Sequence, residues 1–416
     1  MLLASFLEPA QLLAGCVWKI PASLYINVPF CTNRCGYCDF HSLEAGRCAE
    51  GTFDAYIDAL KRQHDFWVSM LGIEAYRTIY IGGGTPSVLG SATLARLLAY
   101  FSRFSTSEIE WTMEANPESV DPAMLAMLRD HGVTRLSLGI QTFSPEKRRM
   151  LERAGNPYKA VDLIRSAHSC GLDVSVDLLA GLPHRSGDPD DCISTTLQDI
   201  LTVADKVDHI SLYDLTVEEG TRLARHVENG QLALPDDDTL KELRDAADTL
   251  LSQHGFMRYE ISNYARPGRE CRHNAGYWDA ESYLGIGSGA VSTLLACSSD
   301  EPERVLHGLR FTGTRDLALY MEYPEAIDSV NMEHLAPATL AFEMLMLGCR
   351  TRRGVSLSRY RQRFGKDISD EIPKTLERWK GHLIWEEERL ALDRASMDIL
   401  NLFLVDCMSE MEGGML

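Results

Sequence analysis

The sequence predicts an α/β fold, an incomplete TIM-type (β/α)6 barrel followed by a mainly helical C-terminal domain. Between residue 23 and about residue 215, β-type runs alternate with helical patterns, which is typical of parallel strand–helix units. Beyond residue 215 this alternation stops, and the last eighty or so residues are mainly helical. The six expected strands cover residues 23–28, 77–81, 109–113, 134–140, 174–179 and 209–213.

Helix signals stand between these strands. Apolar faces recur over residues 53–71 and 94–101. Asp121-Pro122 and Ser144-Pro145 are typical of helix starts, and helical periodicity covers residues 158–170. In a TIM-type barrel the reacting groups gather at the C-terminal ends of the strands. Residues that follow the expected strands are therefore the candidates for a site.

Four parts are expected along the chain. They are an N-terminal segment (1–22), the partial barrel (23–220), a barrel extension (221–335) and a C-terminal helical domain (336–416). A short β-wing over residues 382–392 gives the last part a winged-helix-like character. The apolar N-terminus has no basic region before it and is interrupted by Glu8 and Pro9, so neither a signal peptide nor an integral membrane segment is expected.

Composition narrows the classes of partner. The formal charge is −19, from 41 basic and 60 acidic residues, which argues against nucleic acid as a partner. The basic run of Arg350, Arg352 and Arg353 is accordingly interpreted as a solvated patch rather than a DNA site. Eleven cysteines in 416 residues indicate reduced thiols and a metal site rather than a disulfide scaffold. No stretch approaches membrane-spanning length, so a cytoplasmic location is expected.

Three of these cysteines form a compact motif after the first strand. Cys31, Cys35 and Cys38 have the spacing C-x3-C-x2-C. No fourth cysteine follows nearby, and position 40 is Phe. A loop of this length can give three thiolates to three irons of an iron–sulfur cube and leave the fourth iron open. Two alternatives stay open on spacing alone: a zinc site with His41 as fourth ligand, and three structural thiols.

Other polar or small residues follow the later strands. Gly82-Gly83-Gly84 ends the second strand, where missing side chains let a ligand approach the backbone. Glu114 can accept hydrogen bonds from an ammonium or hydroxyl group, and Arg153 can grip a carboxylate with two hydrogen bonds. Gln141 and Asp177 lie at or near the ends of the fourth and fifth strands. Taken alone, each of these residues is better explained by a structural or solvated role.

The motifs together resemble the HemN/HemW group of radical S-adenosylmethionine (SAM) proteins. YINVPFC, CGYCDF, GGGTPS, EANPE, GIQTF, DLLAGLP and SLYDLTVEEGT occur here in the order of that group. The resemblance implies that Cys31, Cys35 and Cys38 bind a [4Fe-4S] cluster whose open iron holds SAM, which is cleaved to methionine and a 5′-deoxyadenosyl radical. It also implies a set of SAM-contact positions: Tyr25, Tyr37, Gly83, Gly84, Thr85, Glu114, Gln141, Arg153 and Asp177.

Two features place the chain nearer to the haem chaperones of the group than to its coproporphyrinogen III dehydrogenases. The dehydrogenases have a cysteine where Phe40 stands and a longer N-terminal extension. The chaperones carry an H-N-x-x-Y-W motif, matched here by His273, Asn274, Tyr277 and Trp278. One departure is Gly155, where the chaperones often have a histidine. From the residues alone, the preferred interpretation of the motif is a core histidine with packed aromatics. The sequence does not decide whether His273, Cys271 or neither is the haem-iron ligand.

The resemblance therefore implies a haem chaperone that binds haem, a [4Fe-4S] cluster and SAM and delivers haem to acceptor apoproteins. It also implies an electron donor for the cluster, and association into a homodimer is a further expectation. The alternatives are an oxygen-independent coproporphyrinogen III dehydrogenase, which decarboxylates a porphyrinogen oxidatively, and a related radical SAM methyltransferase.

Overall fold

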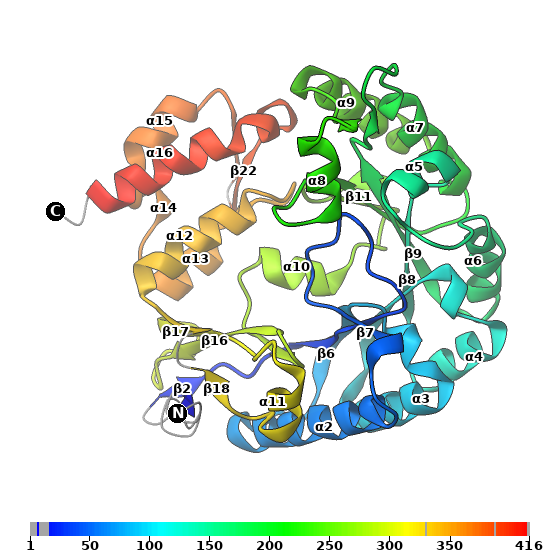
Figure 1. The fold of residues 1–416 in the computed structure, drawn as a ribbon. Helices are drawn as coiled ribbons and strands as arrows, with labels where there is room; N and C mark the ends of the chain where they lie inside the picture. The colour runs from blue at the N-terminus through cyan, green and yellow to red at the C-terminus, as the bar shows by residue number, and fades with distance from the viewer. Residues whose placement is uncertain (1–5, 8–15, 329–330, 387, 414–416) are drawn as a thin grey trace.

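A computed structural model describes residues 6–7, 16–328, 331–386 and 388–413 of the chain. Its centre is a curved sheet in which six parallel strands neighbour one another in the order β11-β9-β8-β7-β6-β3 (Figure 1). This confirms the α/β class and all six expected strands. Their bounds are β3 (Ser23–Val28), β6 (Tyr76–Gly83), β7 (Ser105–Ala115), β8 (Arg135–Gln141), β9 (Asp173–Ala180) and β11 (His209–Asp214).

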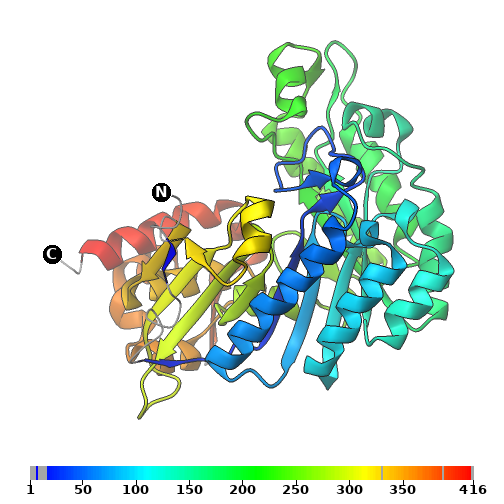
Figure 2. The ribbon, with the colours of Figure 1, turned by 60° about the horizontal axis from the view of Figure 1, so that its bottom comes forward.

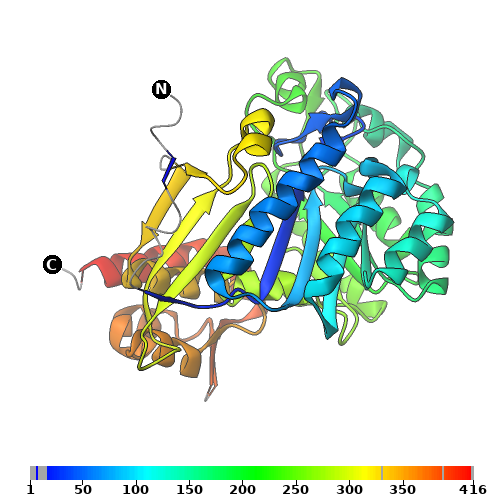
Figure 3. The same cartoon turned by 90° about the horizontal axis from the view of Figure 1, so that it is seen from below.

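Helices cover the outer, convex side of the sheet (Figure 1). Figure 3 shows α2 lying across the outer face beside β3. The expected helix starts are confirmed: Asp121 accepts a hydrogen bond from the N–H of Met124 (2.8 Å), and Ser144 accepts one from Lys147 (3.3 Å). The covering helices are α2 (Thr52–Leu71), α3 (Gly90–Phe101), α4 (Pro122–Asp130), α5 (Pro145–Met150), α6 (Lys159–Ser169), α7 (Cys192–Val203) and α9 (Asp237–Gln253).

Every second residue of the barrel strands is apolar and buried, which explains why the strands were predictable. Leu24, Ile26 and Val28 of β3 are completely inaccessible, and so is Trp111 of β7. The residues between them on the same strands are mostly polar, such as Ser137 of β8, which donates to Asp177 of β9 inside the barrel. The strands therefore alternate between apolar residues that pack against the helices and polar residues that face the barrel interior.

The sheet continues beyond the barrel on both sides. Next to β3 lies β15 (Tyr283–Ile286), which is parallel to it, followed by the antiparallel strands β16 (Val291–Cys297), β17 (Val305–Thr312) and β19 (Met332–Leu335). On the other side β11 pairs with β14 (Asn263–Ala265), and β14 with β13 (Met257–Arg258). The antiparallel part carries the sheet toward the C-terminal helices (Figure 2).

The C-terminal region has its own apolar core, which includes Leu345, Tyr360 and Phe403. The β-wing formed as expected: β21 (Leu383–Glu386) and β22 (Arg389–Leu392) are antiparallel, and β20 (Val355–Ser356) joins β22. The helices are α12 (Pro337–Gly348), α13 (Leu357–Phe364), α14 (Ile368–Glu371), α15 (Pro373–Trp379) and α16 (Leu400–Gly413). The exact boundaries between the four expected parts stay predictions.

The remaining elements are short. They are β1 (Phe6–Leu7), β2 (Val17–Trp18), β4 (Phe30–Cys31), β5 (Leu43–Glu44), α8 (Arg222–Glu228), α10 (Arg272–Trp278), α11 (Leu317–Glu322), β10 (His184–Arg185), β12 (Leu232–Ala233) and β18 (Ile327–Asp328). Within the described ranges, no helix is long and apolar enough to cross a bilayer. Most of the apolar N-terminal segment discussed above, including Glu8 and Pro9, lies outside those ranges.

Candidate functional site

The cysteine loop lies at the C-terminal end of β3, where a barrel site is expected. It is fixed to two later parts of the chain, because the N–H of Gly36 donates to the carbonyl of Leu151 (2.9 Å) and the N–H of Leu223 donates to the carbonyl of Gly36 (2.8 Å). In Figure 1 the loop is the blue trace beside α8, the helix that contains Leu223. The three cysteines are therefore presented by a loop that is braced from both sides.

The three thiols are half-buried and unbridged. The Arg153 guanidinium donates a charge-assisted hydrogen bond to the Cys35 sulfur (3.2 Å), and the Thr85 hydroxyl donates to Cys31 (3.8 Å). Burial raises the pKa of the Cys31 and Cys38 thiols, and each shift is opposed in part by a hydrogen bond, from Thr85 to Cys31 and from the Phe40 backbone to Cys38. Bound iron would stabilise the thiolate forms.

These residues fit an iron–sulfur cluster better than a zinc ion. Within the described part of the chain, no three His, Cys, Asp or Glu side chains are grouped closely enough to hold a single metal ion. A cube spaces its thiolates more widely, since each binds a different iron. His41, the expected fourth zinc ligand, instead has its Nε2 3.1 Å from the Ser288 hydroxyl. The donor set is thus three soft thiols, which suits an iron–sulfur cluster.

The glycine run Gly82-Gly83-Gly84 at the end of β6 is required by the chain's own packing. Gly83 has φ +105°, and its N–H donates to Glu114 Oε2 (3.1 Å). A Cβ at Gly82 would lie 2.9 Å from the Glu114 carboxyl carbon, and one at Gly84 would lie 2.5 Å from the carbonyl oxygen of Phe30. The run therefore lets β6 approach both β7 and the start of the cysteine loop. It also leaves bare backbone at the barrel rim.

Two half-buried carboxyl groups lie inside the barrel. Glu114 accepts a hydrogen bond from the Tyr80 hydroxyl (2.9 Å), and Asp177 accepts one from the Ser137 hydroxyl (3.3 Å). Burial, with a contribution from the charge of Asp177, raises the pKa of Glu114 to about 7, and burial raises the pKa of Asp177 to about 6. A cationic ligand beside Glu114 would offset this desolvation.

Gln141 and Arg153 come together at the end of β8. Gln141 has a positive φ of +71°, which is a strained backbone conformation for a residue with a side chain. Strained residues of this kind are often found at functional sites. Arg153 donates to Asn116 Oδ1 (2.9 Å) and to the carbonyl of Gly139 (2.5 Å). A Cβ on Gly139 would lie 3.2 Å from Arg153 Nη2 and 3.3 Å from Gln141 Nε2. Both side chains therefore converge above the same glycine.

A cavity of about 350 Å³, the rim cavity, collects part of the expected SAM set. Tyr25, Gly83 and Glu114 line it, together with the exposed Phe40. Tyr25 stacks on Tyr80 with ring centroids 6.1 Å apart. Six expected positions do not line this cavity: Tyr37, Gly84, Thr85, Gln141, Arg153 and Asp177. Arg153 and Thr85 are instead tied directly to the cysteines.

The H-N-x-x-Y-W motif lies on α10, inside the curve of the sheet (Figure 1). His273 is 1% exposed and both its ring nitrogens have partners at 2.9 Å, Nδ1 with the Thr78 hydroxyl and Nε2 with the Tyr277 hydroxyl. Burial lowers the pKa of His273 to about 3, so the ring is neutral. The imidazole therefore anchors α10 to β6 and holds Tyr277.

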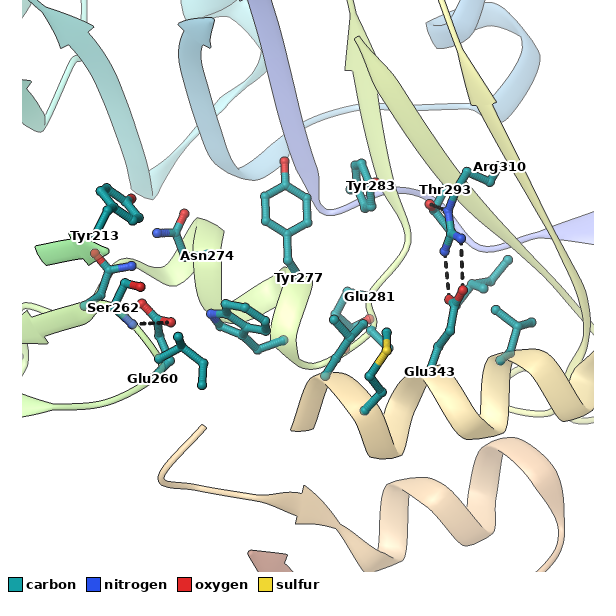
Figure 4. A pocket seen from close by; sticks show the side chains of 18 residues that line it. Tyr213, Glu260, Ser262, Asn274, Tyr277, Glu281, Tyr283, Thr293, Arg310 and Glu343 are labelled. Carbon is teal, nitrogen blue, oxygen red and sulfur yellow. Dashed lines mark hydrogen bonds and ion pairs between the residues drawn. The ribbon is translucent and has the colours of Figure 1, made fainter. Parts of the chain in front are cut away.

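The other three motif residues, Asn274, Tyr277 and Trp278, line a second cavity, of about 660 Å³. Figure 4 shows it, with Asn274 and Tyr277 on one side and Glu343 on the facing helix. Because its walls come from α10, β15–β17 and α12, we call it the α10–α12 cavity. His273 and Cys271 are absent from its described lining, and the Cys271 sulfur faces Glu110 (3.4 Å).

The two cavities share a wall. Tyr277 and Tyr283 line both of them, and their rings meet edge to face with centroids 4.6 Å apart. The barrel rim and the α10–α12 cavity are thus neighbours separated by two aromatic side chains.

Comparison with known proteins assigns the family. Residues 25–196 match the Radical SAM superfamily, and residues 335–398 match the HemN C-terminal domain. The heme chaperone HemW of Mycobacterium tuberculosis is 41% identical over 275 residues, covering 65% of this chain and 69% of that protein. HemW of Lactococcus lactis is 32% identical over 348 residues, covering 83% and 85%. The chain belongs to the HemW family. The resemblance found from the motifs is confirmed.

The fold of this HemW-family chain agrees with a solved structure. The coproporphyrinogen III oxidase HemN of Escherichia coli superposes with a TM-score of 0.77, covering 97% of this chain and 93% of that one, at 19% identity. This likeness establishes a shared architecture across nearly the whole chain.

Sequence reasoning did not find several residues of the α10–α12 cavity in this HemW-family chain. Arg310 and Glu343 face each other through two hydrogen bonds of 2.9 and 2.7 Å, and Glu260 and Tyr213 contribute to another wall (Figure 4). They come from β17, α12, the β13–β14 connection and β11, so no local spacing links them.

Proposed function

We propose that this HemW-family chain is a haem chaperone, which holds haem in the α10–α12 cavity and passes it to acceptor apoproteins. The observation that carries this proposal is the placement of the H-N-x-x-Y-W motif. Asn274, Tyr277 and Trp278 line the cavity, and His273 fixes the helix that presents them. The haem chaperones named among the relatives support it.

The cavity has the character that a porphyrin requires. Its volume of about 660 Å³ falls within the range of roughly 300–1,000 Å³ typical of small-molecule sites. Aromatic side chains (Tyr277, Trp278) and aliphatic ones (Leu295, Leu340, Leu347) supply flat and apolar contact. The described lining contains neither cysteine nor histidine. Haem held by packing, without a strong imidazole or thiolate bond to iron, is suited to release.

The proposal includes a [4Fe-4S] cluster on Cys31, Cys35 and Cys38, with SAM beside it at the rim. A bound cluster would supply one-electron chemistry and a coordination position for SAM. The chain's own part is to orient these groups. Arg153 would neutralise negative charge next to Cys35, and Glu114 would accept hydrogen bonds from a cationic group in the rim cavity. The other expected SAM contacts stay predictions.

An electron donor for the cluster, haem-accepting apoproteins as partners and a cytoplasmic location belong to the same proposal. So does association into a homodimer, which sedimentation of the purified protein would measure. The reduced state of all eleven cysteines is consistent with a reducing compartment.

A transfer assay tests the proposal. Anaerobically reconstituted protein is expected to bind haem, monitored by absorbance, and to pass it unchanged to an apo-acceptor. With SAM and a reductant it is expected to leave coproporphyrinogen III intact, because Phe40 replaces the additional cysteine of the dehydrogenases. Absence of haem binding would refute the chaperone function. Rapid decarboxylation would favour the dehydrogenase, and a methylated product the methyltransferase.

Arg153→Ala is expected to weaken SAM binding by roughly 1.5–3 kcal/mol, the range for a hydrogen bond to a charged group. The half-buried guanidinium donates a hydrogen bond to the Cys35 sulfur (3.2 Å) and presents a fixed positive charge beside it. Equilibrium titration with SAM, following the spectrum of the reduced cluster, measures the change.

Arg165→Ala is the matched control for Arg153→Ala, because Arg165 is an exposed arginine on α6 that pairs only at the surface with Asp162 (3.4 Å). This control should bind SAM like the unmodified protein. If Arg153→Ala kept both its iron content and its full SAM affinity, Arg153 would have no part in holding the cofactor.

A further inference from the structure

A third cavity, of about 880 Å³, lies at the other side of α10, near the amino ends of the barrel strands. Five arginines from four segments of the chain line it, and we call it the arginine cavity. Arg135 comes from β8, Arg258 from β13, Arg272 from α10, and Arg352 and Arg353 from the connection between α12 and β20. Such a concentration of cations is unexpected in a chain of formal charge −19.

Three of these arginines donate hydrogen bonds to backbone carbonyls of the protein, whereas the side chains of the other two are free to bind a ligand. Arg135 donates to the carbonyl of Arg269 (2.8 Å), Arg272 to that of Glu108 (2.7 Å) and Arg258 to that of Ile261 (3.0 Å). Arg352 and Arg353 are exposed at the edge of the cavity and form no ion pair with any residue the structure describes.

Arg135 adds a second sign that the cavity is built for an anion. The residue is 4% exposed, and its Nη1 has no hydrogen-bond partner among the described residues. The nearest carboxylate oxygen, on Glu110, is 3.7 Å away and already accepts the N–H of Arg272 (2.9 Å). A buried guanidinium with an unused N–H gains from any carboxylate that can approach it.

Four acidic residues also line the cavity; three are engaged elsewhere, and the fourth, Glu270, forms no ion pair with Arg352 or Arg353. Asp173 is bound by Arg269 (2.5 Å), Asp279 lies 3.5 Å from Arg359, and Glu110 caps the start of α10 through the N–H groups of residues 272 and 273. Arg352 and Arg353 thus carry charge that the protein itself does not neutralise.

The α10–α12 cavity cannot accommodate the carboxylates of haem. Its charged lining residues are three acids, Glu260, Glu281 and Glu343, and one base, Arg310. Arg310 is already neutralised by the two hydrogen bonds from its guanidinium to Glu343. Carboxylates placed there would be desolvated beside like charges, which is costly. A haem in this cavity must therefore direct its propionates outward.

Trp278 is where the two cavities meet, because it lines both. We propose that the arginine cavity is the propionate site for haem: the macrocycle packs against Trp278 from the α10–α12 cavity, and its two carboxylates are bound by Arg352 and Arg353. This inference rests on the proposed chaperone function and adds the residues that recognise the charged edge of the cargo. Arginine suits the role, because its planar fork matches a carboxylate.

The test compares haem with its dimethyl ester, which keeps the macrocycle and iron but lacks both carboxylates. The unmodified, cluster-loaded protein is expected to bind haem at least tenfold more tightly than the ester, by equilibrium titration followed by absorbance. Arg352→Gln/Arg353→Gln is expected to bind both at the affinity of the ester. Arg352→Lys/Arg353→Lys should keep part of the preference, since charge remains without the fork.

The control, Arg129→Gln/Lys241→Gln, removes two charges from exposed side chains on α4 and α9 and should keep the full preference. Equal binding of haem and ester by the unmodified protein would overturn the propionate site while leaving the chaperone function standing. A full preference retained in Arg352→Gln/Arg353→Gln would also overturn it. Binding of neither compound would instead refute the chaperone function.

Discussion

Replacing Cys31, Cys35 and Cys38 together with alanine is expected to abolish iron binding, from about four irons per chain to none. The three thiols stand on one braced loop, and within the described chain no other group of side chains is placed to replace them. Iron and sulfide analysis after anaerobic reconstitution, with the visible absorbance of the cluster, measures the loss. Haem binding in the α10–α12 cavity should persist, because that cavity contains none of these residues.

Cys297→Ala and Cys349→Ala are the matched controls. Both thiols are buried, at 4% and 0% exposure, and both belong to the core of the C-terminal region, away from the rim. Each variant should reconstitute about four irons. Unmodified protein that takes up zinc and refuses an iron–sulfur cluster would contradict the cluster assignment, whatever the triple variant does.

The barrel was predictable because every second residue of its strands is apolar and packs against the covering helices. The strand Ser23–Val28 was expected at the same bounds that the structure shows. In contrast, β15 was missed because its short run, Tyr283–Ile286, contains a glycine. A Cβ on Gly285 would collide with the backbone of Val291 in the next strand, so the residue that permits the hairpin also removes the strand signal. Its pairing with β3 joins segments about 260 residues apart, which no local pattern encodes.

The site was partly predictable for a similar reason. A spacing of four residues places His273 and Tyr277 on one face of a helix, and the structure joins them by a hydrogen bond. The spacing alone does not determine whether this face of the helix points into the barrel or toward a ligand cavity. The structure divides the motif, with His273 in the barrel and Tyr277 at the wall of two cavities. The arginine cavity depends wholly on tertiary structure, since Arg135 and Arg352 are over two hundred residues apart.

Leu347→Trp is expected to reduce haem affinity at least tenfold, which corresponds to about 1.4 kcal/mol. Leu347 lies on α12 and lines the α10–α12 cavity opposite the motif residues. An indole there would occupy part of the volume of about 660 Å³ that the macrocycle needs. Because Leu347 is only half-buried, the larger side chain can be accommodated without breaking the core.

Leu201→Trp is the matched control for Leu347→Trp. Leu201 is 44% exposed on the outer helix α7, so the same substitution adds an indole to the surface and should leave haem binding unchanged. Thermal unfolding of both variants checks that the fold is kept, and reconstitution checks that each still binds about four irons. A Leu347→Trp protein that is folded, cluster-loaded and still binds haem with full affinity would place the cargo outside the α10–α12 cavity. Both the haem site proposed on α10 and the propionate site beside Trp278 would then be wrong.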